Sequence, residues 1–171
     1  RHVTRLLDDL LLLAQSEAGW HLQMRPISID DILIEVYEVT LNPKLQLQTC
    51  EPAWVMGDSD RLRQVLINLV DNATKYSSSE SIITLDLWRQ NQRVWTQIRN
   101  TGAGISQEHL SQIFEPFFRL HSHSRQSGTG LGLTIVRWII QEHSGEITLE
   151  SSPEIGTTVK FWLPEYNPPA I

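Results

Sequence analysis

The sequence predicts an α/β (α+β) fold, a two-layer sandwich in which helices cover one face of a mixed β-sheet. One observation is helical spacing: in residues 32–39 and 62–73, apolar residues recur three or four positions apart. The other is alternation: in residues 83–87 and 94–98, apolar and polar residues take turns, as in strands with one buried face. Segments of the two kinds follow each other along the chain, which favours one sheet with helices packed against it.

Composition limits the class of protein. The chain has 171 residues, 40% hydrophobic and 20% charged, which is typical of one globular domain with an appendage. Its formal net charge of -6 argues against a nucleic-acid partner, because binding a phosphate backbone calls for a basic face. No apolar run reaches the roughly 18 residues of a membrane-spanning helix, so we expect no membrane segment. The single cysteine, Cys50, excludes an internal disulfide and fits a reducing compartment.

Residues 1–19 carry the apolar seam of a helix that packs in a bundle. The seam is formed by Val3, Leu6, Leu10 and Leu13, which share one helix face. A single helix cannot bury such a seam alone, so we expect it to pack on partner helices; the alternative is that it lies on this domain's own core. The chain opens in mid-pattern without an initiator Met, and we expect it to be a piece of a longer protein.

Caps and breaks place the next elements. Residues 20–29 are predicted to be a linker, because a proline interrupts them. Ser28 or Asp30 can cap the helix that follows, and Asn42-Pro43 ends it. Residues 45–49 alternate as a half-exposed strand.

The middle of the chain predicts a helix followed by a hairpin. Asp58 or Ser59 can cap the helix, whose apolar residues lie on the side that faces the sheet. Residues 83–98 alternate on both sides of the turn-prone Asn91-Gln92 pair, which indicates a β-hairpin.

The last third of the chain completes the two layers. A helix is predicted over residues 130–143, and Ser144-Gly145 closes it. Residues 145–151 and 157–163 supply two more strands. Residues 120–127 lack apolar periodicity and are expected to form a mobile lid.

Four short segments stand out by their residues and their order. They are Asn68–Tyr76, Asn100–Ile105, Phe114–Arg119 and Gly128–Leu133, and a Gly156-Thr157 pair follows them. In this order they resemble the N box, the first glycine box, the F box and the second glycine box of the ATP-binding domain of sensor histidine kinases. That family shares its nucleotide fold with type II topoisomerases, heat-shock chaperone ATPases and mismatch-repair ATPases.

The resemblance covers almost the whole chain and implies a division into parts. Residues 1–19 correspond to the second helix of a dimerisation hairpin, and residues 20–29 to a linker. Residues 30–164 correspond to the ATP-binding catalytic domain, and residues 165–171 form a C-terminal tail.

The first box implies a site for Mg²⁺ and phosphate. Asn68 and Asn72 are four apart and lie on the same helix face. By resemblance, the amide oxygen of Asn72 binds Mg²⁺, and Asn68 supports the same site. Lys75 brings an ammonium group near the phosphates, where it acts as a point charge. Tyr76 packs beside the adenine or the ribose.

The first glycine box implies recognition of adenine. Most members of the family have Asp at the position of Asn100, where it accepts a hydrogen bond from the adenine amino group. The amide oxygen of Asn100 can accept the same bond, so we expect adenine recognition to be retained with a neutral acceptor. Gly102 and Gly104 let the backbone approach the base, and Ile105 lines the pocket. Thr157 resembles the residue that helps to seat adenine through water.

The second glycine box implies a phosphate site at the start of a helix. Backbone N–H groups there attract anions, and Gly128, Gly130 and Gly132 leave room for phosphate oxygens. The intervening Thr129, Leu131 and Leu133 belong to the same box. The chain lacks the G-x-x-x-x-G-K-[ST] of a P-loop, and no parallel strand-turn-helix unit opens it as in a Rossmann fold.

The aromatic block leaves two interpretations open. Phe114, Phe117 and Phe118 either anchor the lid to the core or are plain packing residues. Arg119 can reach toward the phosphates, so Lys75 and Arg119 are the candidate catalytic charges.

The function implied is transfer of the γ-phosphoryl group of ATP, with Mg²⁺, to a histidine on a dimerisation helix, for relay to an Asp of a response regulator. Positioning and charge neutralisation supply the catalysis. The implied partners are ATP, the chain's own dimerisation hairpin in a homodimer, and a response regulator. The implied location is the cytoplasm, whether or not the parent protein is membrane-anchored.

The acceptor motif S-H-E-[LF]-R-x-P does not occur in the chain, so we expect the acceptor histidine to come from another segment. Two alternatives stay open. One is a degenerate nucleotide-binding module that regulates without phosphotransfer. Asn100, in place of the family's usual Asp, supports this alternative. The other is an ATPase of the chaperone or repair type.

Overall fold

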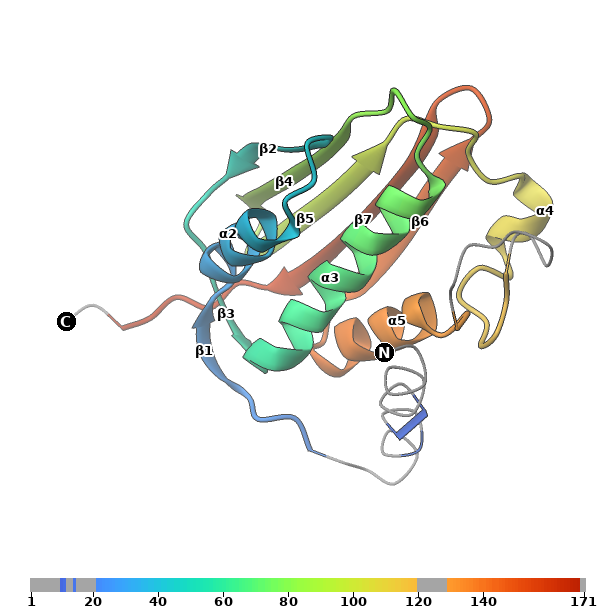
Figure 1. Cartoon of the computed structure of the whole chain (residues 1–171). Helices are drawn as coiled ribbons and strands as arrows, with labels where there is room; N and C mark the ends of the chain where they lie inside the picture. Colours follow the sequence, from blue (N-terminus) through green and yellow to red (C-terminus); the bar gives the residue numbers. More distant parts are fainter. Residues whose placement is uncertain (1–9, 12–13, 15–20, 120–128, 170–171) are drawn as a thin grey trace.

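The computed structural model describes residues 10, 11, 14, 21–119 and 129–169, and the statements below concern these residues (Figure 1). The helices are α2 (Ile29–Thr40), α3 (Ser59–Tyr76), α4 (Gln107–Leu110) and α5 (Gly132–Glu142). The strands are β1 (Arg25–Ser28), β2 (Leu45–Cys50), β3 (Trp54–Gly57), β4 (Ile83–Gln90), β5 (Arg93–Asn100), β6 (Glu146–Ser152) and β7 (Gly156–Pro164).

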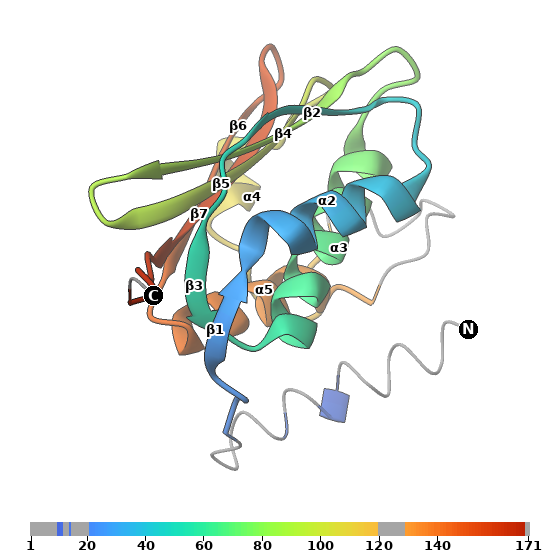
Figure 2. The ribbon, with the colours of Figure 1, turned by 90° about the vertical axis from the view of Figure 1, so that its left-hand side faces the viewer.

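The main sheet has five strands in the order β2-β4-β5-β7-β6. It is mixed, because β2 pairs with β4 in parallel whereas the other neighbours are antiparallel. The helices α2, α3 and α5 lie on one face of this sheet, as the two views show (Figures 1 and 2). The predicted two-layer sandwich is therefore confirmed.

The core lies between the sheet and the helices. Alternation along β4 buries Ile83, Leu85 and Leu87, and the three- and four-residue spacing along α3 buries Leu62 and Leu66. Each of these side chains has 1% of its surface exposed or less. Burial of two matching apolar faces holds the layers together.

Strands β1 and β3 form a small antiparallel sheet, so the prediction that residues 20–29 are only a linker was wrong for residues 25–28. Residues 25–28 were expected to belong to a connection, yet they pair with Trp54–Gly57, so that Arg25 lies opposite Gly57 and Ser28 opposite Trp54. Pro26 is tolerated because β1 is an edge strand. The two strands are short, and the whole of α2 lies between them in the sequence. Local sequence patterns therefore do not reveal the pairing.

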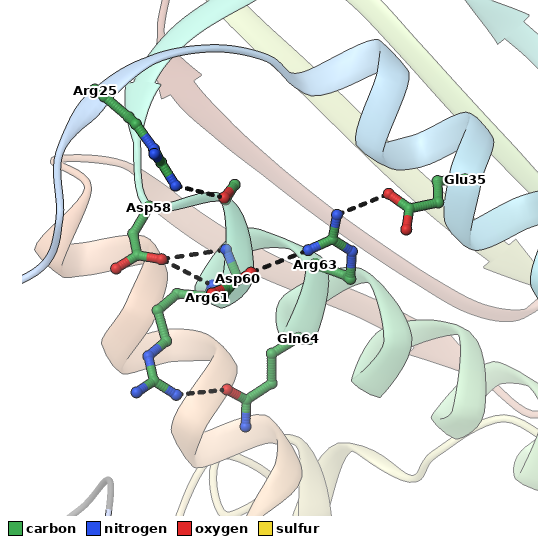
Figure 3. Close-up of polar contacts among 8 residues, drawn as sticks. Arg25, Glu35, Asp58, Asp60, Arg61, Arg63 and Gln64 are labelled. Carbon is green, nitrogen blue, oxygen red and sulfur yellow. Dashed lines mark hydrogen bonds and ion pairs between the residues drawn. The ribbon is translucent and has the colours of Figure 1, made fainter.

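The helix starts differ in how they are capped. For α2, neither expected residue caps the helix with its side chain. The Ser28 hydroxyl instead donates to Asp30 Oδ1 (2.6 Å), which also accepts a hydrogen bond from Ala53 N (3.0 Å). For α3, the expected cap is present: Asp58 Oδ1 accepts hydrogen bonds from Asp60 N and Arg61 N, both at 3.2 Å (Figure 3).

Other boundaries agree or shift slightly. The hairpin turn lies at Asn91 and Gln92 as predicted, and both have positive φ, 53° and 59°, as a tight hairpin requires. The last helix begins at Gly132, later than predicted, because Gly130 has φ +74° and cannot be helical. The short α4 was not predicted.

Several expectations fall on residues outside the described ranges. They concern the lid at 120–127, Gly128 and most of the helix in 1–19. Of that helix, residues 10, 11 and 14 are helical, and the side chains of Leu10 and Leu11 are 40% and 57% exposed. Within the described residues, no helix combines the length and hydrophobicity needed to cross a membrane.

Candidate functional site

A pocket lies between the helical layer and the sheet, beside the end of β5. It holds about 400 Å³ of empty space, some of it open to solvent. Its lining residues are Leu69, Asn72, Ala73 and Tyr76 of α3, Ile98 and Asn100 of β5, Ile105 and Ile113 of the segment after β5, Leu133 of α5, Leu149 of β6, and Thr157 and Val159 of β7.

The pocket brings together residues that the sequence placed in separate boxes. Those among the predicted site residues are Asn72, Tyr76, Asn100, Ile105, Leu133 and Thr157. The apolar residues of the pocket wall were not predicted as site residues. Their helical and strand spacing predicted that they belong to the core, and the same side chains also line the pocket. Their position was a usable signal: Leu69 and Ala73 flank Asn72 on α3, and Ile98 precedes Asn100 on the same face of β5.

One face of α3 carries the predicted metal and phosphate groups. Asn68 is buried, and Asn72, one turn later, is half-buried and lines the pocket. Lys75 is half-buried in the last turn but is not part of the pocket lining, whereas Tyr76 is part of it. In the described part of the chain, no group of three or more His, Cys, Asp or Glu side chains is placed to hold a metal. A metal here would therefore depend on amide oxygens and on the ligand itself.

Asn100 is the buried polar group of the pocket. Its side chain is 3% exposed, at the end of β5, with Thr157 as its cross-strand neighbour on β7. Its Nδ2 atom is buried and has no hydrogen-bond partner among the described residues. A buried donor of this kind is costly to leave unpaired, so it indicates a ligand or a water that completes the bond.

The first glycine loop is held on two sides. Gly104 has φ +68°, and a Cβ there would overlap the carbonyl oxygen of Ser152. The next amide, Ile105 N, donates to Ser151 Oγ (2.7 Å), and this bond fixes the loop to the end of β6. At Gly102, a Cβ would come within 2.8 Å of the Tyr76 carbonyl oxygen at the end of α3. Only glycine permits both of these backbone approaches.

A third glycine brings Thr157 to the pocket. Gly156 has φ +93°, and any Cβ there would overlap the carbonyl oxygen of Asn100. The close approach of these two backbones sets Thr157 opposite Asn100. The Thr157 hydroxyl is hydrogen-bonded to Ser151 Oγ at 2.7 Å.

The second glycine loop leads into the start of α5. Thr129 Oγ1 accepts a hydrogen bond from Leu131 N (3.2 Å), and no side chain of the described residues caps the helix at Leu131. Apart from its chain neighbours and its own helix backbone, no atom of the described residues lies within 4 Å of the place a Cβ of Gly132 would take. Leu131 is fully buried in the core, so any contact it makes with a ligand uses its backbone. The uncapped start of a helix with open space beside it is suited to an anion.

The aromatic block is attached to α5 mainly through its backbone. Phe117 N donates to Gly130 O (2.9 Å), and the Thr134 hydroxyl donates to Phe114 O (2.9 Å). Phe117 itself is 60% exposed. These contacts join the block to the second glycine loop and to α5. Arg119 is exposed and does not line the pocket.

His143 has a structural role that the sequence did not indicate. It is 2% exposed; its Nδ1 donates to Ile139 O (2.7 Å) and its Nε2 accepts from Asp58 N (3.0 Å). Burial lowers the pKa of His143, although the Ile139 carbonyl, Asp58 and Glu142 act in the opposite direction. The ring therefore joins the end of α5 to the start of α3 in its neutral form.

Known proteins are similar to this chain over nearly its whole length. "Circadian input-output histidine kinase CikA" of Synechococcus elongatus (strain ATCC 33912 / PCC 7942 / FACHB-805) is 34% identical over 177 residues, which cover 96% of this chain and 23% of the relative. "Adaptive-response sensory kinase SasA" of Rippkaea orientalis (strain PCC 8801 / RF-1) is 37% identical over 173 residues, covering 96% of this chain and 44% of the relative. The chain thus spans less than half of these curated relatives.

A solved structure is also similar over nearly the whole chain. Full-length ShkA, crystallised in complex with AMPPNP, matches with a TM-score of 0.82 and 25% identity, over 99% of this chain and 37% of that chain. Residues 57–167, which include every box of the site, match the family described as "Histidine kinase-, DNA gyrase B-, and HSP90-like ATPase". The chain belongs to this ATPase family.

Proposed function

We propose that this chain is the ATP-binding catalytic domain of a sensor histidine kinase. In this proposal it transfers the γ-phosphoryl group of ATP to a histidine on a dimerisation helix, for relay to an Asp of a response regulator. The observation that carries the proposal is one pocket that joins Asn72 of α3, Asn100 of β5, Ile105 of the first glycine loop and Leu133 of α5. The kinase names of the relatives favour phosphotransfer over a purely regulatory module.

The pocket suits the base of ATP. Leu69, Ala73, Ile98 and Val159 provide apolar walls for a flat aromatic ring. Asn100 is the buried amide that meets the polar edge of the base. Tyr76, which lines the pocket and is partly exposed, packs beside the base or the ribose in this arrangement.

The start of α5 suits the phosphates. Its N–H groups attract anions, and the open side of Gly132 leaves room for phosphate oxygens. Lys75 and Arg119 are assigned the role of neutralising charge as the phosphoryl group leaves. Loose phosphoryl transfer needs positioning and charge neutralisation more than covalent chemistry, so this set of groups is sufficient on the nucleotide side.

Asn72 fits a magnesium ion that arrives with the nucleotide. Mg²⁺ prefers oxygen ligands, retains several waters, and often takes only one or two ligands from the protein. The amide oxygen of Asn72 satisfies this requirement, and Asn68, one turn earlier, supports its position. The bound ion would neutralise phosphate charge.

The remaining parts of the proposal concern partners. Residues 1–19 are assigned to the second helix of a dimerisation hairpin, in agreement with the exposed Leu10 and Leu11. A homodimer, a response regulator and a cytoplasmic location follow from the kinase assignment. The same assignment ends the catalytic domain at residue 164 and gives residues 165–171 to the tail. The domain begins with β1 at residue 25, because this strand pairs with β3.

The test is phosphotransfer between separate polypeptides. The chain is incubated with ATP labelled at the γ-phosphate, with and without a dimerisation hairpin of the parent protein that contains the acceptor histidine. We expect acid-labile label on the hairpin only. A hairpin with its histidine replaced by Gln is the control and stays unlabelled. Acid-stable label on the chain itself, or ATP binding without any transfer, would contradict the proposal.

A further inference from the structure

In the function proposed above, the Asn100 side chain contacts the base, and its carboxamide can present either a donor or an acceptor. A carboxamide carries an acceptor, Oδ1, and a donor, Nδ2, and a half-turn about its last bond exchanges them. In most buried amides the surrounding hydrogen bonds decide which atom points where. At Asn100 that decision is missing, because the buried Nδ2 has no hydrogen-bond partner among the described residues.

The neighbours of Asn100 explain why its orientation is open. The side chain of the cross-strand residue, Thr157, is hydrogen-bonded to Ser151 Oγ at 2.7 Å. The preceding residue on the same face of β5, Ile98, and the loop residue Ile105 are apolar and offer no side-chain partner. A ligand in the pocket is therefore able to select the orientation of the amide.

We propose, on the basis of the function proposed above, that this pocket accepts purine nucleotides with either an amino or an oxo group at position 6. With Oδ1 turned to the base, Asn100 accepts a hydrogen bond from a 6-amino group, as in ATP. With Nδ2 turned to the base, it donates a hydrogen bond to a 6-oxo group, as in inosine triphosphate. Asn100 is thus a specificity-determining residue that permits both classes.

A side chain that can only accept hydrogen bonds would favour one of the two classes of purine. A carboxylate has no proton to donate at neutral pH, so a 6-oxo group would face it without a hydrogen bond. Discrimination then comes from the mismatch against the wrong ligand and not from a better fit to the right one. Asn100→Asp should therefore restrict the pocket to 6-amino purines.

The experiment measures affinity by calorimetric titration of MgATP and magnesium inosine triphosphate. We expect the unchanged chain to bind the two within about tenfold of each other, and Asn100→Asp to weaken inosine triphosphate relative to ATP by about 10- to 100-fold more. Asn167→Asp, in the exposed C-terminal tail, makes the same chemical change away from the pocket and should leave both affinities unaltered.

The outcomes separate the two proposals. If the unchanged chain already prefers ATP by more than about 100-fold, the inference is wrong whatever the variant does. If neither nucleotide binds the unchanged chain, the proposed function fails instead. Asn100→Ala provides a second check if the Asp variant does not fold, because losing both faces should weaken the two nucleotides by the same factor. Weakening of ATP alone would overturn the inference.

Discussion

At the scale of single residues, the proposed site depends on the amides of α3 and β5. The resemblance of the N box singled out Asn68 and Asn72, and helical spacing put them on one face. The structure places Asn72 in the pocket lining. Asn100 could be predicted from its glycine box. Its unpaired Nδ2 could not, because that property depends on which groups the folded chain brings near it.

Asn72→Ala should remove Mg²⁺-dependent nucleotide binding without unfolding the chain. Losing the oxygen ligand is expected to weaken MgATP by at least about tenfold, by analogy with the effect of altered metal-site groups. The free energy of unfolding should change by less than about 1 kcal/mol, because Asn72 is only half-buried.

Calorimetric titration with ATP, in the presence and in the absence of Mg²⁺, measures this effect. Asn167→Ala is the matched control, since it removes an exposed amide from the tail. Unchanged MgATP affinity in Asn72→Ala would remove Asn72 from the metal site.

At the scale of elements, a substitution at the start of α5 should change nucleotide affinity and stability in opposite directions. Gly132 is the first residue of the helix and has open space where a Cβ would lie. Gly132→Ala should raise the free energy of unfolding by up to about 1 kcal/mol, because alanine is a better helix former than glycine. It should at the same time weaken MgATP, since the methyl group takes space that we assign to phosphate.

Thermal unfolding and nucleotide titration on the same sample test this pairing of effects. Gly156→Ala is the contrasting variant: its Cβ would overlap Asn100 O, so it should be destabilised in the absence of any ligand. If Gly132→Ala binds MgATP as tightly as the unchanged chain, the phosphates lie elsewhere.

Elements with a local signal were predicted, and those without one were not. The α3 helix has a capping Asp58 and a long apolar stripe, and the β4–β5 hairpin has its turn residues. In contrast, β1 and β3 have four residues each and depend on each other across α2. Such a pairing leaves no mark in either segment, so only the folded chain reveals it.

At the scale of the whole molecule, stability depends on a contact between distant segments. The hydrogen bond from Asp58 N to His143 Nε2 joins residues 85 apart in sequence. The sequence around His143 gave no sign of this contact, because its partner is known only once α3 and α5 are packed. Burial of the same ring lowers the pKa of His143, so we expect the free energy of unfolding to depend on pH.

The sign of this dependence follows from the lowered pKa of His143. The unfolded chain takes up a proton near the ordinary histidine value, about pH 6.5, whereas the folded chain does so only at lower pH. The contribution to stability is therefore complete above about pH 6.5 and is lost as the pH falls from there through the folded pKa.

Urea unfolding at about pH 7.5 and pH 5.5 measures the effect. We expect the unchanged chain to lose stability between the two values, and His143→Gln to lose less, although it is less stable at the higher pH. His21→Gln removes an exposed histidine and should behave like the unchanged chain. Equal losses in His143→Gln and the unchanged chain would refute this assignment.

The parallel pairing of β2 with β4 has a consequence for how the chain folds. The β4–β5 and β6–β7 pairs join neighbours in sequence, so they can form early as hairpins. Strand β2 must wait, since β3 and all of α3 lie between it and β4, and closing that long loop costs entropy before any pairing rewards it. It also lies at the sheet edge, and its register shifts between Leu47 and Thr49. The expected order is therefore that β2 joins the sheet last and opens first, while β5 and β7, which line the pocket, stay paired.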